Sequence, residues 1–374
     1  MAQPDRPAHH EVALFLPHLR GGGAEKMVAA LANGLSARGY RVDMVLVRAA
    51  GVHLQELSAE VQVIDLAARN SYLALPRLMK YLRRQQPQVL VSSLPLTNLI
   101  AIIAHRLARS RSRLAIRIEN TTSAQRRAPW KKMLEKSLLS WLYPSADMII
   151  AVSRAVAKDA ERYLGLHASR IDVIYNPVLE PVPDAAGASR PAHPWYRDGC
   201  PPVVLAVGRL TPAKDFPTLI RAFSEVRRQR FARLVVLGEG EERLNLLALA
   251  RELGVANDTD LPGFVSDVRS FMRHSAVFVL SSLYEGLPTV LIEALASGCA
   301  VVSTDCPGGS REILADGAYG DLVPVGDAHA MASPILRNLG GERKYVELAW
   351  LQQFRLDTVL DQTVEALQLP PPPA

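Results

Sequence analysis

Short apolar runs alternate along the chain with longer stretches in which apolar residues recur every three or four positions. Because strands that are apolar on both faces must be covered on both sides, the pattern predicts parallel sheets flanked by helices. Seven strands are expected in the first half of the chain, at residues 12–17, 40–47, 61–66, 88–93, 113–118, 147–153 and 171–177.

Residues 176–202 interrupt this alternation with a proline-rich stretch that has no apolar periodicity, which we interpret as an interdomain linker. The alternation then restarts, and strands are expected at 202–210, 232–240, 276–282, 299–305 and 319–325. The sequence thus predicts two tandem Rossmann-like, doubly wound α/β domains, residues 1–180 and 181–345. We expect a C-terminal helix in 346–374 that packs back toward the first domain, plus a proline-rich tail. Ligands of such sheets bind beyond the carboxyl ends of the strands, so two facing domains would form a cleft.

The composition is that of a soluble globular protein, with 374 residues of which 49% are hydrophobic and 21% are charged. No apolar run approaches the roughly 20 residues that a membrane-spanning helix needs, and the first residues lack a signal-peptide pattern. Cys200, Cys299 and Cys306 are odd in number and have no CxxC spacing, so neither a disulfide framework nor a zinc site is indicated. We therefore expect a cytoplasmic protein.

Positive charge is concentrated in the first half of the chain. Lys and Arg outnumber Asp and Glu by 25 to 14 in residues 1–180, and are outnumbered by 18 to 23 in residues 181–374. The excess is densest over 106–136, where ten basic residues accompany only Glu119 and Glu135. Such a patch attracts nucleic acid, an anionic membrane or a phosphate-bearing substrate, although an ordinary solvated face has the same composition.

A triple glycine, residues 21–23, follows the first predicted strand, and a helix is expected to begin at Ala24 or Glu25. Glycines let the backbone approach a ligand closely, and a helix N-terminus favours an anion. Lys26 stands where a GxGxxG motif would have its last glycine, and no GK[ST] follows. This excludes the usual dinucleotide and P-loop motifs, while a simple tight turn remains an alternative.

Two basic residues, Arg209 and Lys214, lie around the end of the strand 202–210, just before the next helix. An arginine fork and a lysine point charge at such a place are suited to hold a diphosphate. Two ordinary surface bases would look the same in the sequence.

The stretch "LYEGLPTVLIEALASG", residues 283–298, holds two glutamates in an otherwise apolar run. Charged residues rarely enter such a run unless they are paired or in use. Glu285 is expected on a loop at the sheet edge and Glu293 more than one turn into a helix. Thr289, Glu293 and Ser297 also form a polar stripe at helical spacing, so a solvent-facing Glu293 is an equal alternative.

Between the glutamates, Pro288 suits the first turn of a helix. Gly286 and Leu287 precede it and offer no side-chain cap, which leaves backbone donors for an anion or a sugar hydroxyl. Residues 307–309, Pro-Gly-Gly, repeat this arrangement after the next strand.

The motifs "GGGAEK", "VGRLTPAKDFPTLIRAF", "LPGFVSDV" and "SSLYEGLPTVLIEALASGCAVVSTDCPGGSREI", in this order, resemble family 4 of the retaining nucleotide-sugar glycosyltransferases, which have the GT-B fold. The resemblance spans nearly the whole chain. The wording of these motifs resembles members that build bacterial envelope polysaccharides on lipid carriers.

The resemblance implies roles for the candidate residues. Arg209 and Lys214 would neutralise the departing diphosphate, Glu285 would face the hydroxyls of the donor sugar, and Glu293 would bind the ribose. Further donor contacts are implied at Gly22, Gly23, Gly263, Phe264, Val265, Gly286 and Leu287. Many relatives have a histidine at the end of the fifth strand; here Glu119 and Asn120 stand there instead, and we assign them to the acceptor side.

The implied reaction transfers a hexosyl unit from a nucleoside-diphosphate sugar, expected to be UDP-linked, to a saccharide acceptor on a lipid. It needs no metal ion or other cofactor if two cations stabilise the leaving group, and "DTD" at 258–260 is interpreted as a turn rather than a metal motif. A sugar-nucleotide epimerase of the same fold is the alternative. A nucleic-acid-binding protein would leave Glu285 and Glu293 without a use, so no nucleic-acid partner is expected.

Residues 126–142 predict a contact with the anionic inner face of the cell membrane. Trp130, Met133, Leu134, Leu138 and Trp141 fall on one helical stripe, with Lys131, Lys132 and Lys136 flanking or opposing it. A basic helix with tryptophans on its apolar side suits a bilayer interface. Packing of this stripe into the protein core is the alternative.

Overall fold

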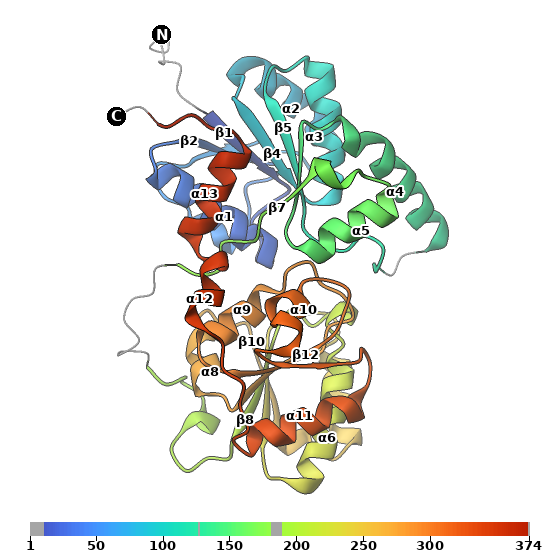
Figure 1. The fold of residues 1–374 in the computed structure, drawn as a ribbon, viewed down its shortest axis with the longest axis vertical. Helices are drawn as coiled ribbons and strands as arrows, with labels where there is room; N and C mark the ends of the chain where they lie inside the picture. The colour runs from blue at the N-terminus through green and yellow to red at the C-terminus, as the bar shows by residue number, and fades with distance from the viewer. Residues whose placement is uncertain (1–10, 126–127, 181–188, 373–374) are drawn as a thin grey trace. The chain divides into compact units, whose positions relative to one another are not determined.

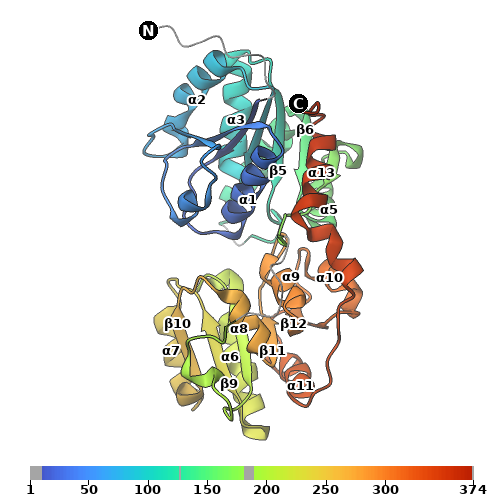
Figure 2. The ribbon, with the colours of Figure 1, turned by 90° about the vertical axis from the view of Figure 1, so that its left-hand side faces the viewer.

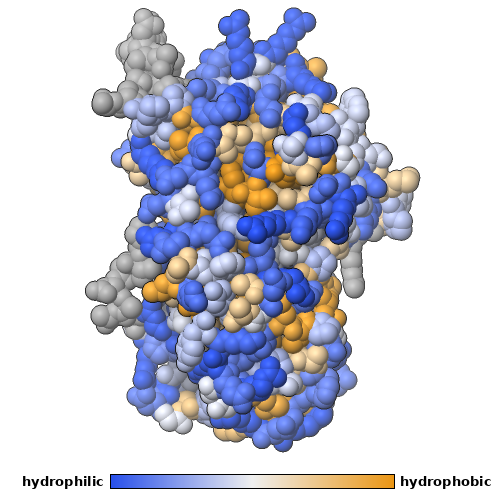
Figure 3. All heavy atoms as spheres, viewed as in Figure 1, coloured by the Kyte–Doolittle hydropathy of each residue, from blue (hydrophilic) through white to orange (hydrophobic). Residues whose placement is uncertain are grey.

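The computed structural model describes residues 11–125, 128–180 and 189–372. The chain divides into two compact units: unit 1 comprises Met1–Glu180 with Gln353–Ala374, and unit 2 comprises Pro181–Gln352. Each unit is a parallel sheet covered by helices on both faces (Figures 1 and 2). The predicted fold class, two doubly wound α/β domains, is confirmed. On the face drawn in Figure 3 most residues are hydrophilic, and apolar residues gather in a few patches.

The sheet of unit 1 has the strand order β3-β2-β1-β4-β5-β6-β7, and all its pairs are parallel. Its strands are β1 (Glu11–Leu16), β2 (Arg41–Leu46), β3 (Gln62–Asp65), β4 (Val89–Ser93), β5 (Arg113–Ile118), β6 (Met148–Ala151) and β7 (Ile171–Val173). The strand order reverses between β1 and β4, so their carboxyl ends flank the point where such sheets bind ligands.

Side-chain caps mark the start of two helices of unit 1. Asn70 caps α2 by accepting a hydrogen bond from the Leu73 backbone, and Ser153 caps α5 through Val156. The helices are α1 (Gly23–Ala37), α2 (Ser71–Gln85), α3 (Pro95–Ala108), α4 (Pro129–Leu142), α5 (Arg154–Leu164) and α13 (Leu356–Ala366).

The last helix, α13, packs on α1 within unit 1. Leu360 is buried against Gly34, where an added Cβ would lie 2.6 Å from the Leu360 Cδ1 atom. The Arg38 guanidinium is 2.7 Å from the Asp361 carboxylate. The core of unit 1 is therefore completed by residues from the end of the chain.

The sheet of unit 2 has the order β10-β9-β8-β11-β12-β13, again all parallel. Its strands are β8 (Val203–Val207), β9 (Arg233–Leu237), β10 (Thr259–Gly263), β11 (Val277–Leu280), β12 (Ala300–Thr304) and β13 (Asp321–Val323). Its helices are α6 (Phe216–Gln229), α7 (Arg243–Glu252), α8 (Val268–His274), α9 (Thr289–Ala296), α10 (Ser310–Ile313), α11 (Ala328–Leu339) and α12 (Leu348–Leu351). The switch point lies between β8 and β11.

Strand β10 was not predicted, and the interpretation of residues 258–260 as a turn is wrong for the last two of them. Thr259 and Asp260 are the first residues of β10, an edge strand whose Asp and Pro content hides it from the sequence pattern. Asp258 precedes the strand and pairs with Arg227 at 2.6 Å and Arg233 at 2.5 Å. These contacts give Asp258 a structural role.

The predicted linker, residues 176–202, extends too far on both sides. The Val178 and Leu179 N–H groups donate to the Phe354 carbonyl at 3.0 Å within unit 1. Tyr196 is buried in unit 2, where its hydroxyl is 2.8 Å from Ser275 Oγ. Proline suppressed the apolar periodicity of this stretch, although its ends pack into the two units.

Candidate active site

The predicted cation Lys214 and the predicted carboxylate Glu285 meet at the switch point of unit 2. Lys214 lies in the loop after β8 and Glu285 in the loop after β11. The Lys214 Nζ donates to Glu285 Oε1 at 2.5 Å, and Ser282 Oγ donates to the same oxygen at 2.6 Å. The two charged side chains are only 22% and 12% exposed. The fold thus joins groups that are 71 positions apart in the sequence.

Small hydroxyl residues at the strand ends hold these loops together. Ser281 Oγ donates to the Lys214 carbonyl at 2.7 Å, and Thr304 Oγ1 donates to the Ser282 carbonyl at 2.7 Å. These residues are not among those predicted from the sequence. Their signal was available, since each lies at the carboxyl end of a predicted strand. The bonds hold Lys214 and Glu285 in place in advance of any ligand.

The loop after β12 approaches the backbone of Glu285 closely, and glycine makes this approach possible. The Glu285 N–H donates to the Pro307 carbonyl at 2.9 Å, and the Gly309 N–H donates to the Gly286 carbonyl at 2.8 Å. Gly308 has φ +135°, and a Cβ there would lie 2.4 Å from the Glu285 carbonyl oxygen. The Pro-Gly-Gly sequence therefore supports the loop that carries Glu285.

Arg209 supplies the net positive charge of this site. Its side chain is exposed and makes no hydrogen bond or ion pair with the residues that the structure describes. Lys214, in contrast, is largely balanced by Glu285. An anion that enters beside β8 would therefore find a guanidinium fork that no carboxylate of the described chain occupies.

Glu293 lies in α9 and is only 7% exposed, so the alternative that it faces solvent is wrong. A carboxylate is costly to bury unless it is paired or hydrogen-bonded. Helix α9 begins after Pro288 without a side-chain cap, as predicted from Gly286 and Leu287, which are both buried.

Cys306 lies beside the Glu285 loop but carries no charge there. Burial, with a contribution from the Glu285 charge, raises the pKa of the Cys306 thiol to about 11. The thiol is therefore protonated at neutral pH and adds no charge beside Lys214 and Glu285.

The loop predicted to read the base follows β10. Gly263 ends the strand, Val265 is partly buried, and the Phe264 ring is 67% exposed. The Gly238 N–H donates to the Gly263 carbonyl at 2.8 Å, which aligns this loop with the end of β9. Phe264 thus presents an open aromatic face at the carboxyl edge of the sheet.

The remaining candidates belong to unit 1. Gly22 is the N-cap of α1 and Gly23 its first residue, with no side-chain cap. The Glu25 carboxylate lies so close to Gly22 that a Cβ there would be 1.9 Å from Glu25 Oε2. His18 Nδ1 lies 3.8 Å from Glu25 Oε1. The glycine loop is therefore bordered by a carboxylate as well as by the helix N-terminus.

At the end of β5, Glu119 is engaged within the protein. Arg117 is buried, and its Nε donates to Glu119 Oε1 at 2.9 Å while its Nη2 donates to Asn176 Oδ1 at 2.7 Å. Arg117 is not among the predicted site residues, because a charged residue inside an apolar strand gives no hint of its partners. Asn120 accepts a hydrogen bond from the Thr121 backbone at 2.8 Å and stays partly exposed.

No group of three or more His, Cys, Asp or Glu residues that could hold a metal ion is found among the described residues.

Replacing Gly308 by alanine tests the close approach to Glu285. Gly308→Ala introduces both a clash and a disfavoured φ, so we expect a loss of about 3 kcal/mol of stability in unit 2. Gly298→Ala is the matched control, because Gly298 also has positive φ, +72°, but its Cβ would meet nothing within 4 Å. The control should lose only about 1 kcal/mol. Equal melting temperatures for the two variants would contradict this account.

Comparisons with known proteins place the chain in a family. Residues 21–178 match the family model described as Glycosyltransferase Family 4, and residues 194–349 match Glycosyl transferases group 1. A Campylobacter jejuni N-acetylgalactosaminyltransferase is 30% identical over 333 residues, covering 86% of this chain and 88% of its own length. The lipopolysaccharide core biosynthesis glycosyltransferase LpsE of Rhizobium meliloti is 37% identical over 46% of this chain and 51% of its own length.

Solved structures show the same fold. Sucrose-phosphate synthase from Thermosynechococcus elongatus superposes with a TM-score of 0.78 at 19% identity, over 96% of this chain and 98% of that one. HepE from Anabaena, solved with UDP and glucose, gives 0.77 at 20% identity, over 96% and 100%. The chain belongs to the glycosyltransferases, with an amino-terminal family 4 domain and a carboxyl-terminal group 1 domain.

Proposed function

We propose that this glycosyltransferase moves a hexosyl unit from a UDP-sugar to a lipid-linked saccharide, with retention at the anomeric carbon, in the synthesis of a bacterial envelope polysaccharide. The observation that supports the donor site most is the Lys214–Glu285 pair beside Arg209, at the switch point of unit 2. The acceptor class is supported by the name of the Campylobacter jejuni relative, which acts on a diphospho-undecaprenol saccharide. The UDP donor is supported by HepE, which was solved with UDP and glucose.

In the proposed mechanism, the bond between the anomeric carbon and the diphosphate oxygen breaks while the acceptor oxygen bonds to the same face of that carbon. The acceptor proton passes to the departing phosphate oxygen, so no protein nucleophile is needed. Arg209 binds the growing negative charge as a fork, and Lys214 adds a point charge whose position Glu285 fixes. Glu285 also accepts hydrogen bonds from the sugar hydroxyls, and Glu293 binds the ribose.

The other donor contacts complete this assignment. Backbone groups of Gly286 and Leu287 would meet the sugar and diphosphate, and the loop Gly263–Val265 would meet the base, where Phe264 offers an aromatic face. Gly22 and Gly23, in unit 1, stay predicted donor contacts. On the acceptor side we favour Asn120 over Glu119, because the Glu119 carboxylate is already bonded to Arg117. An epimerase of the same fold would convert the donor without any acceptor, so incubation with donor alone distinguishes the two.

Loss of either cation should slow sugar transfer. We expect Arg209→Ala and Lys214→Ala each to lower kcat by ~10²-fold, about 3 kcal/mol of leaving-group stabilisation. Arg251→Ala is the control, since Arg251 is an exposed residue of α7 outside the loops that carry the site. Initial rates are compared after thermal melting shows that each variant is folded. Wild-type rates in a folded Arg209→Ala variant would disprove the assignment of this fork to the diphosphate.

Transfer should continue when divalent cations are chelated, because the proposed mechanism assigns leaving-group stabilisation to Arg209 and Lys214. The rate is measured in excess EDTA and again after Mg²⁺ or Mn²⁺ is restored. Abolition by EDTA with recovery on adding metal would show that a metal ion carries this charge instead.

Helix α4 supports a contact with the membrane surface. Trp130, Met133, Leu134, Leu138 and Trp141 are 38–71% exposed, so the alternative that this stripe packs into the core is wrong. Leu139 and Leu142, on another face of the helix, are the residues that anchor α4 to unit 1. No helix in the described part of the chain has both the length and the apolarity to cross a bilayer. Exposed tryptophans on a basic helix suit shallow insertion into an anionic interface.

The lysines of α4 differ in their surroundings, which decides how the contact is tested. Lys132 donates to the Ser123 carbonyl, and Lys132 and Lys136 both lie over the Tyr163 ring, at 5.7 and 5.0 Å. Charge reversal at these two positions would disturb unit 1 itself. Lys131 contacts only the neighbouring Trp130 ring among the interactions described, at 5.3 Å. Arg126 and Arg127 lie outside the described residues.

Removing the exposed stripe should release the protein from vesicles. We expect Trp130→Ser/Lys131→Glu/Trp141→Ser to lose sedimentation with phosphatidylglycerol vesicles at low salt, while UDP binding is unchanged. The matched control is Tyr72→Ser/Leu73→Ser, which removes two exposed apolar residues of α2 in the same unit. Wild-type protein should be released at high salt, because each basic residue contributes on the order of 1 kcal/mol at such a surface. Equal sedimentation of the wild type and the α4 variant would contradict the membrane assignment.

A further inference from the structure

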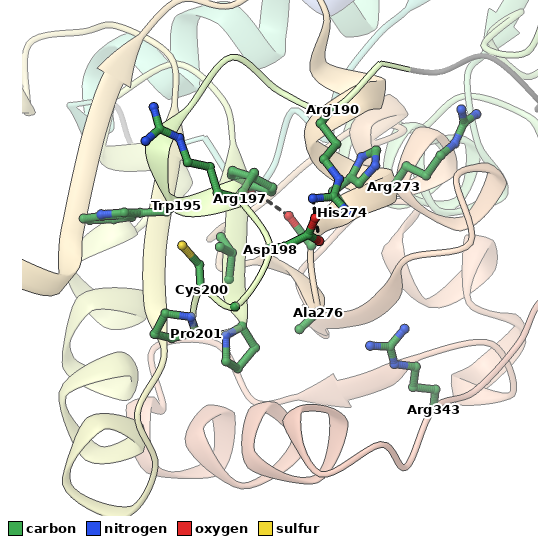
Figure 4. A pocket seen from close by; sticks show the side chains of 15 residues that line it. Arg190, Trp195, Arg197, Asp198, Cys200, Pro201, Arg273, His274, Ala276 and Arg343 are labelled. Carbon is green, nitrogen blue, oxygen red and sulfur yellow. Dashed lines mark hydrogen bonds and ion pairs between the residues drawn. The ribbon is translucent and has the colours of Figure 1, made fainter.

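Unit 2 contains a cavity of about 380 Å³ at the opposite edge of its sheet from the proposed donor site (Figure 4). Its lining includes Val203, the first residue of β8, and Ala276, which precedes β11 and whose N–H donates to the Val203 carbonyl at 2.9 Å. Arg209 and Glu285 follow the carboxyl ends of the same two strands. A five-residue strand spans about 17 Å, so the two places are distinct.

The lining of this cavity is strongly basic. It includes Arg190, Arg197, Arg273 and Arg343, against a single acidic residue, Asp198. Unit 2 as a whole is slightly acidic, with 17 Lys and Arg against 20 Asp and Glu in residues 181–352. The concentration of arginine at the cavity is therefore a local feature and does not follow from the composition of the unit.

These guanidinium groups are available to a ligand. The side chains of Arg197, Arg273 and Arg343 make no hydrogen bond or ion pair with the described residues. Arg190 pairs with Asp198 at 2.6 Å, but the side chains are 51% and 89% exposed. An exposed pair of this kind contributes about 0–1 kcal/mol, so a ligand with two or more negative charges can displace Asp198 from Arg190.

The directions of the side chains divide the arginines into two groups (Figure 4). Arg190 reaches toward Asp198 beside His274, and Arg343 projects toward the cavity from the other side. Arg197 and Arg273 stand at the rim and point outward. The His274 Nδ1–H donates to the Ser270 carbonyl at 2.9 Å, which leaves Nε2 for another partner. Arg190 and Arg343 thus flank the cavity, and the rim arginines add positive potential.

We propose that this cavity binds a soluble anion of the phosphate class with two or more negative charges, such as a diphosphate. Guanidinium forks match pairs of phosphate oxygens, and two of them facing one cavity suit two linked phosphates better than a single carboxylate. The bound anion would connect the segment of residues 190–203 to Arg343, which follows α11. Binding would therefore stabilise unit 2 without contact with the donor site.

Inorganic pyrophosphate is the probe. Because the proposed donor site would also bind it, binding is measured in a variant whose donor site is weakened. In the Arg209→Ala/Lys214→Ala background, calorimetry should still detect pyrophosphate binding, with a rise in melting temperature. Adding Arg190→Ala/Arg343→Ala should weaken this binding at least 10-fold. Adding Arg228→Ala/Arg251→Ala, two exposed arginines of α6 and α7 outside the cavity, removes the same charge and should leave it unchanged. Equal affinity in the two quadruple variants, or no binding in the background, would overturn the proposal.

A lipid headgroup offers the same chemistry as a free phosphate, and vesicles distinguish the two sources. The same variants are sedimented with phosphatidylglycerol and with phosphatidylcholine vesicles. We expect the cavity variant and its control to sediment equally with phosphatidylglycerol. If the background variant does not bind pyrophosphate and the cavity variant loses vesicle binding, the cavity binds a lipid headgroup instead. Neither experiment measures sugar transfer, so their outcome is independent of the proposed reaction.

Discussion

The ion pair between Lys214 and Glu285 is the interaction on which the site in unit 2 depends. It joins the loop after β8 to the loop after β11. Ser282 reinforces the pair by donating a hydrogen bond to the same Glu285 oxygen. Because both side chains are largely buried, removal of one partner would leave the other charge buried without its counter-ion, at a cost of about 3–5 kcal/mol of stability. The pair is thus a positioning device: Lys214 and Glu285 each fix the other, and Arg209 beside them carries the charge that an anionic ligand would meet.

The sequence predicts this site in part because parallel sheets place their strand ends together. Arg209, Lys214 and Glu285 each follow a buried apolar strand, so their meeting at one edge could be expected from the pattern alone. The direct contact of Lys214 with Glu285 could not, since it depends on loop conformations that Gly308, Ser281 and Thr304 determine. The burial of Glu293 could not be predicted either, because a polar stripe at helical spacing looks the same on a buried helix face and on an exposed one.

The predictions from the sequence failed or stayed open where the residue types do not indicate the observed structure. Strand β10 contains Asp260 and Pro262, residues that strands avoid, and only its pairing with β9 at the sheet edge makes it a strand. Arg117 sits in an apolar strand and is tolerated because Glu119 and Asn176 satisfy its guanidinium. On α4, the sequence identified the apolar stripe but could not show that it is exposed, which follows from the burial of Leu139 and Leu142 on another face.

The return of α13 to unit 1 has a consequence for how the chain acquires its structure during synthesis. Unit 2 is continuous, so its core can close once residue 352 has left the ribosome. Unit 1 is interrupted by unit 2, so Gly34 on α1 can contact Leu360 only after more than 300 further residues have been synthesised. The amino-terminal domain of a chain commonly folds first. Here the amino-terminal unit is instead the last to complete its core. A nascent chain that stops short of α13 would carry a finished second unit and an open apolar groove on the first.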